Sequence, residues 1–278
     1  MAVKIVTDST ADLPSDVAHQ LGITVVPLNV HFGDETFRDG VDLDAGEFFR
    51  RLPKAPRVPT TSQPSPGAFL EVYRPLLEAG HQVVSIHISS KLSGTVNSAL
   101  QARAHLEGAS VEVVDSLQVT ASLALVVVAA ARAVQAGASY QEAIGAAHRA
   151  RERVHLLAYL DTLEYLKKGG RIGKVQAVVG TLLRVRPVVT VHEGIVHSAT
   201  KVRSRAQGIE YMVSVARDRA PLEQAMVIYS TEPDDARALA ERLGSLVEGG
   251  NVIVGRVGPV LGTYTGPGAF GIAVQARG

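Results

Sequence analysis

The chain has 278 residues, with 28 Lys and Arg against 27 Asp and Glu, so its formal net charge is +1. This balance argues against a protein that binds nucleic acid over its whole surface, because such proteins carry a strong basic excess. The absence of cysteine excludes disulfides, Cys-ligated zinc, iron–sulfur clusters and thiol nucleophiles. The hydrophobic share of 46% is ordinary for a globular protein and allows a sizeable core.

The N-terminus lacks the pattern of a secretory signal peptide. The longest purely apolar run, Leu123–Ala131, is much shorter than the roughly 20 residues that a membrane span needs. We therefore expect a cytoplasmic protein without a transmembrane segment. A transient contact with a membrane surface remains open.

Strand and helix patterns alternate over residues 1–160, which predicts βαβ units and a mainly parallel sheet. Strands are expected at Val3–Thr7, Ile23–Val30, Gln82–Ile88, Val111–Asp115 and Val154–Leu160. Helices are expected at Pro14–Leu21, Asp42–Leu52, Pro66–Ala79, Ser93–Leu106, Val119–Gln135 and Tyr140–Arg153. His31–Gly40 is expected to form a turn or hairpin, and the proline-rich stretch from Pro53 to Pro66 an ordered loop without regular structure.

The pattern changes near residue 160 and predicts a second domain of the α+β class over residues 161–278. Helices are expected at Leu163–Lys168, Val175–Leu183, Ser204–Arg219 and Pro233–Val247. A hairpin is expected from Pro187–His192 and Gly194–Thr200, and strands at Gln224–Tyr229, Val252–Val257 and Gly271–Gln275. The glycine-rich residues before the last strand are expected to be a loop. The predicted fold class is therefore α/β, with an N-terminal, mainly parallel sheet domain over residues 1–160 and a C-terminal α+β domain.

Two letter matches to nucleotide-binding motifs lack the necessary context. Gly266–Gly271 reads G-x-G-x-x-G but contains a proline and leads into a strand rather than a helix. Gly173-Lys174 has no upstream glycine of a P-loop and is followed by valine. Neither match predicts a nucleotide site.

Three hydroxyl-rich loops are candidates for chemistry: Asp8–Thr10, Thr60–Ser62 and Ser89–Thr95. Ligands of parallel sheets bind beyond the carboxyl ends of the strands. Ser93 and Gly94 lie where a helix is expected to begin, so a hydroxyl and an amide could both donate to one oxygen acid. The alternative for Ser93 is an ordinary helix cap, and for the other two loops it is hydrogen bonding to their own backbone.

Arg171 lies within Gly169-Gly-Arg-Ile-Gly173, where three glycines imply a tight backbone path. A guanidinium is well suited to bind carboxylate or phosphate. The alternative is an exposed arginine after a helix C-cap.

Taken together, six stretches of the sequence resemble the DegV family. They are Lys4–Leu13 (KIVTDSTADL), Pro59–Ser65 (PTTSQPS), Ser89–Ser98 (SSKLSGTVNS), Val114–Ser116 (VDS), Leu163–Gly173 (LEYLKKGGRIG) and Gly258–Gly268 (GPVLGTYTGPG). The resemblance covers nearly the whole chain in order. It implies two α/β domains with a long-chain fatty acid held between or within them.

The resemblance further implies a lipid-binding protein that is not itself an enzyme and that carries neither cofactor nor metal. Its members are similar to the fatty-acid-binding subunits of bacterial fatty acid kinase. In that system a separate kinase subunit phosphorylates the carboxylate of the bound acid and produces an acyl phosphate. The implied partners are thus a long-chain fatty acid and a fatty acid kinase subunit, with no nucleic acid.

The resemblance also implies roles for individual residues. By family position, the carboxylate would be bound by Thr61 and Ser93, with Ser62 and the Gly94 amide alongside. Arg171 would assist the transfer carried out by the partner kinase, and Arg203 would contact that kinase. The family often has histidine where this chain has Tyr264, and tyrosine donates a hydrogen bond but does not titrate near neutral pH. We therefore expect Tyr264 to help bind the carboxylate.

Two other functions remain open. A stand-alone phosphotransferase or hydrolase would use the Ser93 loop, with Lys91 and Asp115 as the nearest candidate bases. An interaction protein, for instance a transcriptional one, would need only macromolecular contacts. Residues 148–220 hold 14 basic and 6 acidic groups, net +8, and include Arg171 and Lys201–Arg205. This basic block is either a docking surface for an acidic partner or a set of solvated helix faces.

Overall fold

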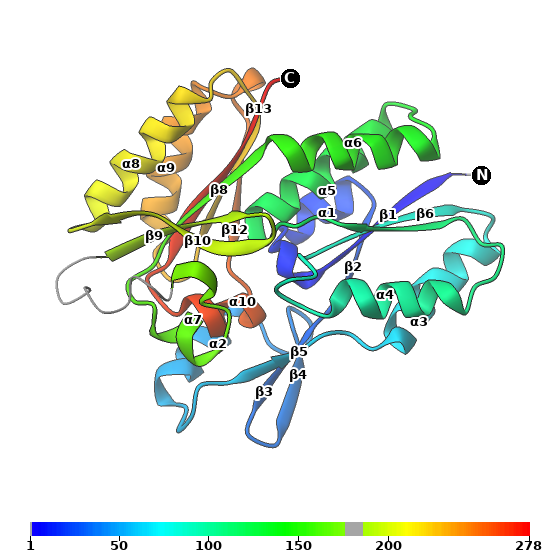
Figure 1. Ribbon diagram of the computed structural model, residues 1–278, viewed down its shortest axis with the longest axis horizontal. Coiled ribbons are helices and arrows are strands. Elements are labelled where there is room, and N and C mark those ends of the chain that lie inside the picture. Colours follow the sequence, from blue (N-terminus) through cyan, green and yellow to red (C-terminus); the bar gives the residue numbers. More distant parts are fainter. Residues whose placement is uncertain (1, 176–185) are drawn as a thin grey trace.

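Three sheets organise the protein in the computed structural model, which describes residues 2–175 and 186–278 (Figure 1). The first sheet is parallel throughout, in the order β2-β1-β6-β7. Its strands are β1 (Val3–Asp8), β2 (Ile23–Val26), β6 (Gln82–His87) and β7 (Val111–Asp115). This sheet and its helices confirm the predicted α/β class.

The second sheet is mixed, in the order β10-β9-β8-β13-β11-β12. Its strands are β8 (Val154–Tyr159), β9 (Arg186–His192), β10 (Ile195–Val202), β11 (Leu222–Tyr229), β12 (Val252–Arg256) and β13 (Phe270–Ala276). The expectation that Val154–Leu160 extends the parallel sheet is wrong, because β8 pairs antiparallel with β13 and β9. Its main partner lies more than 100 residues later in the chain, where no local pattern can reveal it. The domain boundary at residue 160 stays a prediction.

A third, small antiparallel sheet has the order β4-β3-β5. It contains β3 (Asn29–Phe32), β4 (Glu35–Arg38) and β5 (Thr60–Ser62). The single strand expected at Ile23–Val30 is thus two strands in two sheets, separated at Pro27, which has no N–H to donate. The hairpin expected within His31–Gly40 is confirmed, whereas the proline-rich stretch contains a short strand that pairs with β3.

Nine of the ten described α-helices lie close to the predicted ranges, and α10 was not predicted. The ten are α1 (Ser15–Gln20), α2 (Ala45–Arg51), α3 (Pro66–Glu78), α4 (Thr95–Ala104), α5 (Thr120–Gln135), α6 (Tyr140–Arg153), α7 (Glu164–Lys168), α8 (Arg205–Asp218), α9 (Pro233–Gly244) and α10 (Pro259–Thr265). Short 3-10 turns are η1 (Ser9–Ala11), η2 (Leu52–Lys54) and η4 (Glu248–Gly250). The helix expected at Val175–Leu183 lies, after its first residue, outside the described residues. In the described part of the chain, no helix is both long and apolar enough to span a membrane.

Helix α10 corrects the prediction of a glycine-rich loop before the last strand. Pro259 occupies its first turn, where a missing N–H costs nothing, and Gly266 follows its last residue at φ +69°. Proline in the first turn and glycine after the last are ordinary signals for the start and end of a helix. Here they lie only seven residues apart, and Gly262 and Gly268 make the segment look like a loop.

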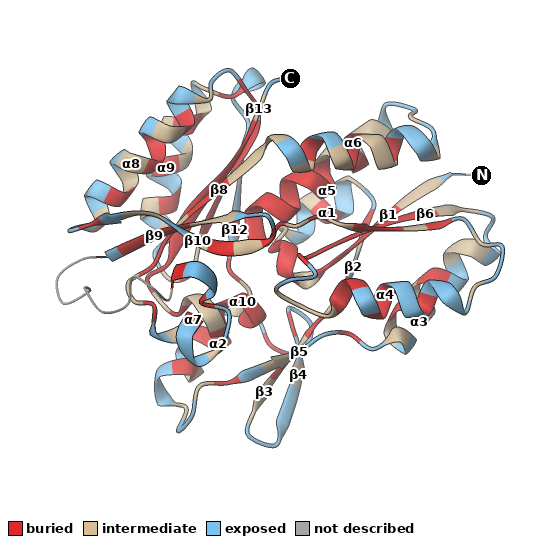
Figure 2. Cartoon of the chain, in the orientation of Figure 1, coloured by how far each residue is buried: buried red, intermediate tan, exposed pale blue. Residues whose placement is uncertain are grey.

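Helix α5 lies between the first and second sheets. Almost every residue from Thr120 to Ala131 is buried, and Figure 2 shows this helix red along most of its length. It packs on β1 and β6 on one side and on β8, β11 and β13 on the other, so apolar residues surround its whole circumference. Helices α8 and α9 cover the outer face of the second sheet, whereas α3 and α4 cover that of the first (Figure 1).

Candidate functional site

A cavity of about 330 Å³ lies between the loops that follow the strands of the first sheet and the inner face of the second sheet. Most of its wall is aliphatic and comes from the C-terminal half of the chain. These apolar residues are Leu156, Ala158, Leu160, Leu166, Val189, Val191, Val196, Ile228, Val257, Val260, Leu261, Ala269 and Phe270. A wall of this kind favours an apolar ligand or an apolar part of a ligand.

Polar side chains complete the wall, mostly from the N-terminal half. They are Thr10, Thr61, Ser62, Gln63, Ser93, Thr120, Arg171, Tyr264 and Thr265. The cavity therefore combines a long aliphatic surface with hydroxyl groups and one arginine. This is the composition expected for an amphipathic ligand with a small acidic head.

Thr61 and Tyr264 connect the two halves of the chain at this cavity. Thr61, on β5, forms a hydrogen bond through Oγ1 with the Tyr264 hydroxyl on α10. The guanidinium carbon of Arg171 lies 5.3 Å from the centre of the Tyr264 ring, a cation–π distance. A Cβ atom at Gly169 would come within 2.4 Å of the same ring. The glycine therefore allows α7 to end directly against Tyr264.

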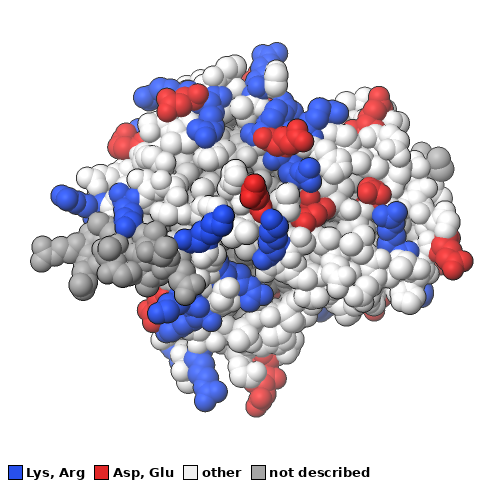
Figure 3. Space-filling model, viewed as in Figure 1, with Lys and Arg blue, Asp and Glu red and all other residues white. Residues whose placement is uncertain are grey.

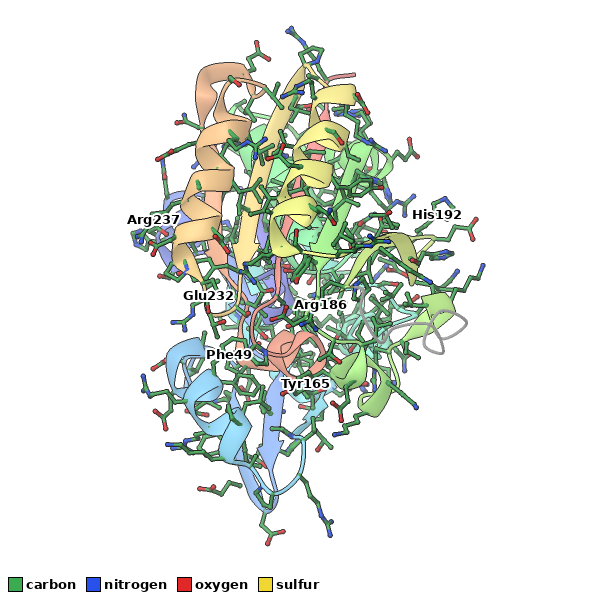
Figure 4. The ribbon with its side chains drawn as sticks, turned by 90° about the vertical axis from the view of Figure 1, so that its left-hand side faces the viewer. Phe49, Tyr165, Arg186, His192, Glu232 and Arg237 are labelled. Carbon is green, nitrogen blue, oxygen red and sulfur yellow. The ribbon has the colours of Figure 1, made fainter. Side chains whose placement is uncertain are left out.

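Aromatic side chains from two other helices fix the position of α10. Figure 4 shows Phe49 of α2 and Tyr165 of α7 next to this helix. A Cβ at Gly262 would lie 2.9 Å from Phe49 Cζ, and one at Gly266 would lie 2.3 Å from Tyr165 Cδ2. Phe48 approaches Gly262 even more closely, so the glycines let three rings pack against this segment, which places Tyr264 at the cavity.

Arg171 is exposed and held by the backbone around it. Its Nε donates to the Leu92 carbonyl at 3.2 Å, and its Nη1 donates to the Gly169 carbonyl at 2.9 Å. Gly169 caps α7, and Gly170 has φ +70°, which glycine adopts readily. The helix-cap interpretation is therefore correct for the glycines, and the side chain that follows them lines the cavity as well.

Ser93 lines the cavity just before α4. Its Oγ is 2.8 Å from Thr95 Oγ1 and accepts a longer hydrogen bond of 3.4 Å from the Thr95 N–H. The helix begins at Thr95 with Gly94 as its N-cap residue, two residues later than predicted. Gly94 does not line the cavity but an adjoining surface hollow. A Cβ there would lie 2.2 Å from Gln63 Oε1, so glycine leaves room for that side chain.

Two predicted residues stand apart from this cluster. Ser62 lines the cavity, but its Oγ lies 3.0 Å from His31 Nε2 and 3.4 Å from Asn29 Nδ2, on the small antiparallel sheet. Adjacent residues of a strand point to opposite faces, which explains why Thr61 and Ser62 have different partners. Arg203 is exposed between β10 and α8, where its N–H donates to Gln207 Oε1 at 2.8 Å. It lines neither the cavity nor the adjoining hollow.

Sequence reasoning missed a buried pair of carboxyl groups beside α10. Asp12 Oδ1 accepts from the Gly258 N–H at 2.8 Å, and Oδ2 accepts from the Thr120 hydroxyl at 2.7 Å. Burial raises the pKa of Asp12 well above its usual range and that of Asp39 to about 7. A Cβ at Gly258 would lie 3.0 Å from Asp39 Oδ1 and 3.2 Å from Asp12 Oδ1, so both carboxyl groups meet at the start of this helix.

A buried chain of hydrogen bonds in the first sheet was also missed. The Tyr73 hydroxyl donates to Ser85 Oγ at 2.7 Å, and Ser85 Oγ lies 2.7 Å from His87 Nε2. His87 Nδ1 lies 2.9 Å from Asp8 Oδ2, which also accepts from the Ile88 N–H. None of these four side chains lines the cavity, and all are fully buried. The serine, histidine and aspartate are therefore part of the core.

Comparison with known proteins shows one family over the whole length. The sequence model described as "Uncharacterised protein, DegV family" matches residues 2–277. A DegV domain-containing protein of Streptomyces coelicolor is 39% identical over 280 residues, which are 99% of either chain. A Thermus thermophilus structure described as showing fatty acid binding of a DegV family protein has a TM-score of 0.92 and 37% identity, over 100% of both chains. A stearic-acid-binding protein from Eubacterium ventriosum has a TM-score of 0.87 and 29% identity, over 99% of this chain and 98% of that one. The chain belongs to the DegV family.

Proposed function

We propose that this protein binds a long-chain fatty acid in the cavity between its first and second sheets. The observation that carries the proposal is the aliphatic wall combined with hydroxyl groups and Arg171. Each buried CH₂ group of an acyl chain contributes roughly 0.8 kcal/mol, so the tail supplies most of the affinity. The structural neighbours from Thermus thermophilus and Eubacterium ventriosum, both described as fatty-acid-binding, support the same ligand class.

In this proposal the carboxylate lies at the polar part of the cavity. The Ser93 hydroxyl donates a hydrogen bond to it, and so does one hydroxyl of the hydrogen-bonded pair Thr61 and Tyr264, with Ser62 and the Gly94 amide nearby. A buried carboxylate without donors would be costly, and neutral donors at this position offset that cost. Arg171 lies beside the head group and extends to the surface. No cofactor or metal is required.

We further propose that a separate fatty acid kinase subunit phosphorylates the bound acid, as in the systems that the sequence resembles. Arg171 assists that transfer, and Arg203 contacts the kinase. Lys and Arg side chains gather on the face of the molecule that carries α7 and the β9–β10 hairpin, which suits an acidic or nucleotide-bearing partner (Figure 3). A cytoplasmic location fits this role.

A stand-alone phosphotransferase or hydrolase gains no support from the contacts of Ser93. Its hydroxyl is paired with Thr95, and the Asp115 carboxylate accepts from the Ser90 and Leu117 backbone N–H groups. Lys91 lies at the surface beside this loop. Among the described residues, therefore, none is positioned to act as a general base for Ser93.

Lipid extraction and mass spectrometry of the purified protein test the proposal directly. We expect a co-purified fatty acid and, after its removal, saturable palmitate binding. Ser93→Ala should weaken that binding by ~1–3 kcal/mol, the cost of losing one neutral donor, whereas the exposed cap variant Ser65→Ala should not. A lipid-free protein that also fails to bind added palmitate would refute the proposal.

The kinase role needs a second measurement. With the kinase subunit and ATP, acyl phosphate can be trapped by hydroxylamine. Arg171→Ala should reduce this product more than it reduces palmitate binding. Equal losses of both would contradict the role assigned to Arg171.

A further inference from the structure

A second hollow, of about 380 Å³, opens on the surface beside the cavity. Its lining residues are Ser90, Lys91, Leu92, Ser93, Gly94, Gly170, Arg171, Gly173 and Ile195. We call it the Lys91 groove. Leu92, Ser93 and Arg171 line both spaces, so the groove adjoins the cavity at its polar part. A group attached to the head of a ligand in the cavity would enter this groove.

The groove is cationic. Lys91 and Arg171 are both exposed, and neither forms an ion pair with an acidic residue of the described chain. Arg171 uses one N–H on Nε and one on Nη1 for backbone carbonyls, which leaves three of its five N–H groups for a ligand. Two acidic residues belong to the adjoining segments: Asp115 accepts from the backbone of Ser90 and Leu117, and exposed Glu193 precedes Gly194 in the β9–β10 turn.

The structure holds the stem of Lys91 in place. A Cβ at Gly194, in the β9–β10 turn, would lie 3.5 Å from Lys91 Cδ. Buried Ser89 donates from Oγ to the Gly194 carbonyl at 2.9 Å and accepts from the Lys91 N–H at 3.2 Å. This one hydroxyl therefore ties the turn to the loop that carries Lys91, a residue that lines the groove.

We propose that the Lys91 groove binds the phosphoryl group of an acyl phosphate whose acyl chain occupies the cavity, with Lys91 as a binding residue for that group. The inference rests on the proposed function. When a carboxylate oxygen forms a bond to the terminal phosphorus of a nucleoside triphosphate, the bond from that phosphorus to the diphosphate oxygen breaks. The nucleoside diphosphate leaves with that electron pair, and no proton has to move.

The product differs from the bound acid in two respects that match the groove. Its head is a tetrahedral group larger than a carboxylate, and it carries more negative charge. Ser93 lies between the two spaces, next to the oxygen that joins acyl and phosphoryl groups, while Lys91 and Arg171 face the outer oxygens. Charge-assisted hydrogen bonds of this kind are stronger than neutral ones.

Hexadecyl phosphate, a stable compound with a C16 chain and a phosphate head, tests this inference without any kinase. Its binding and that of palmitate are measured by displacement of a fluorescent fatty acid from the delipidated full-length protein, below the concentrations at which micelles form. Lys91→Met keeps an apolar stem and removes the charge. We expect it to weaken hexadecyl phosphate binding about tenfold, the size of one charge-assisted hydrogen bond at a partly exposed site, and to leave palmitate binding unchanged.

Lys54→Met removes an exposed lysine far from the groove and should change neither affinity. The loss in Lys91→Met should shrink at high salt, because the interaction is between exposed charges. Equal effects of Lys91→Met on both ligands, or no effect on either, would overturn the inference while leaving fatty acid binding intact. Failure of the wild-type protein to bind palmitate would instead overturn the proposed function.

Discussion

The two large sheets line the same cavity with different chemistry. Loops after strands of the parallel sheet, together with β5, supply most of the hydroxyl groups, including Thr10, Thr61 and Ser93. The mixed sheet and α10 supply most of the aliphatic wall. Parallel strands end in loops at one edge, which favours polar groups with free backbone amides, whereas the face of an antiparallel sheet offers a continuous apolar surface. The division implies that affinity and head-group recognition can be changed separately.

The largest expected effect comes from reducing the space on the apolar side. Ala158 on β8 lines the cavity, and Ala158→Phe would place a ring where acyl carbons lie. If the ring displaces about four CH₂ groups, palmitate binding should weaken by roughly 3 kcal/mol, or on the order of 100-fold. A fatty acid about four carbons shorter should bind almost as well as to the wild-type protein. Displacement titrations over a series of chain lengths measure this.

Leu100→Phe, on the exposed face of α4, is the matched control for added volume and should bind every chain length normally. If Ala158→Phe weakened short and long acids equally, the mixed sheet would not be the wall of the acyl site. A melting temperature near that of the wild-type protein excludes simple misfolding as the cause.

A smaller effect is expected on the polar side. Thr61→Val removes the hydroxyl that bonds to Tyr264 but keeps the shape of the side chain. Palmitate binding should weaken by ~1–3 kcal/mol, with the same change for all chain lengths, because only the head group is affected. Ser62→Ala should have little effect, since that hydroxyl contacts His31. Isothermal titration with both variants tests whether neighbouring residues of β5 differ as the structure indicates.

The smallest expected effect is on stability between pH 6 and 7. It concerns Asp39, which lies where the two sides of the molecule meet at α10. Burial raises the pKa of Asp39 to about 7, so the folded protein holds a proton that the unfolded chain, with a pKa near 3.9, has released. The free energy of unfolding therefore falls as the pH rises from about 4 to 7, by roughly 1 kcal/mol between pH 6 and 7. Asp39→Asn should reduce the slope of thermal stability against pH in this range without abolishing it, because burial also raises the pKa of Asp12.

Asp42→Asn is the control for this experiment. The Arg38 side chain lowers the pKa of exposed Asp42 to about 2, so between pH 6 and 7 this carboxylate is ionised in both the folded and the unfolded chain, and its loss should leave the pH dependence there unchanged. An Asp39→Asn protein with the wild-type pH dependence would contradict a protonated carboxyl group beside α10.

Strands and helices with strong local patterns were predictable from the sequence. Gln82–His87 follows from an apolar run, and Tyr140–Arg153 from small apolar residues at helical spacing and from the capping pair Ser139 and Glu142. The partner of β8 and the strand character of Thr60–Ser62 were not predictable, because both depend on pairing with distant residues. Pairing with a strand far away in the chain leaves no periodic signal in either segment.

The candidate site was predictable where its residues lie in distinctive local strings, and not where it depends on distant contacts. Thr61, Ser93, Arg171 and Tyr264 lie in distinctive strings of residues, and the structure brings all four to one cavity. The burial that raises the pKa of Asp39 depends on α10, which lies more than 200 residues later in the chain. The aliphatic wall likewise consists of ordinary core residues, whose role is visible only once the sheets are placed around an open space.

The hydrogen-bonded chain through His87 has a practical consequence. His87 Nδ1 lies 2.9 Å from Asp8 Oδ2, an acceptor, so this ring nitrogen carries a proton that faces Asp8. That proton lies in the fully buried interior, away from solvent. The same Asp8 accepts hydrogen bonds through its other oxygen from Thr10, whose side chain lines the cavity. The Nδ1 proton of His87 thus provides a built-in NMR resonance through which events at the cavity can be followed without any added label at the site.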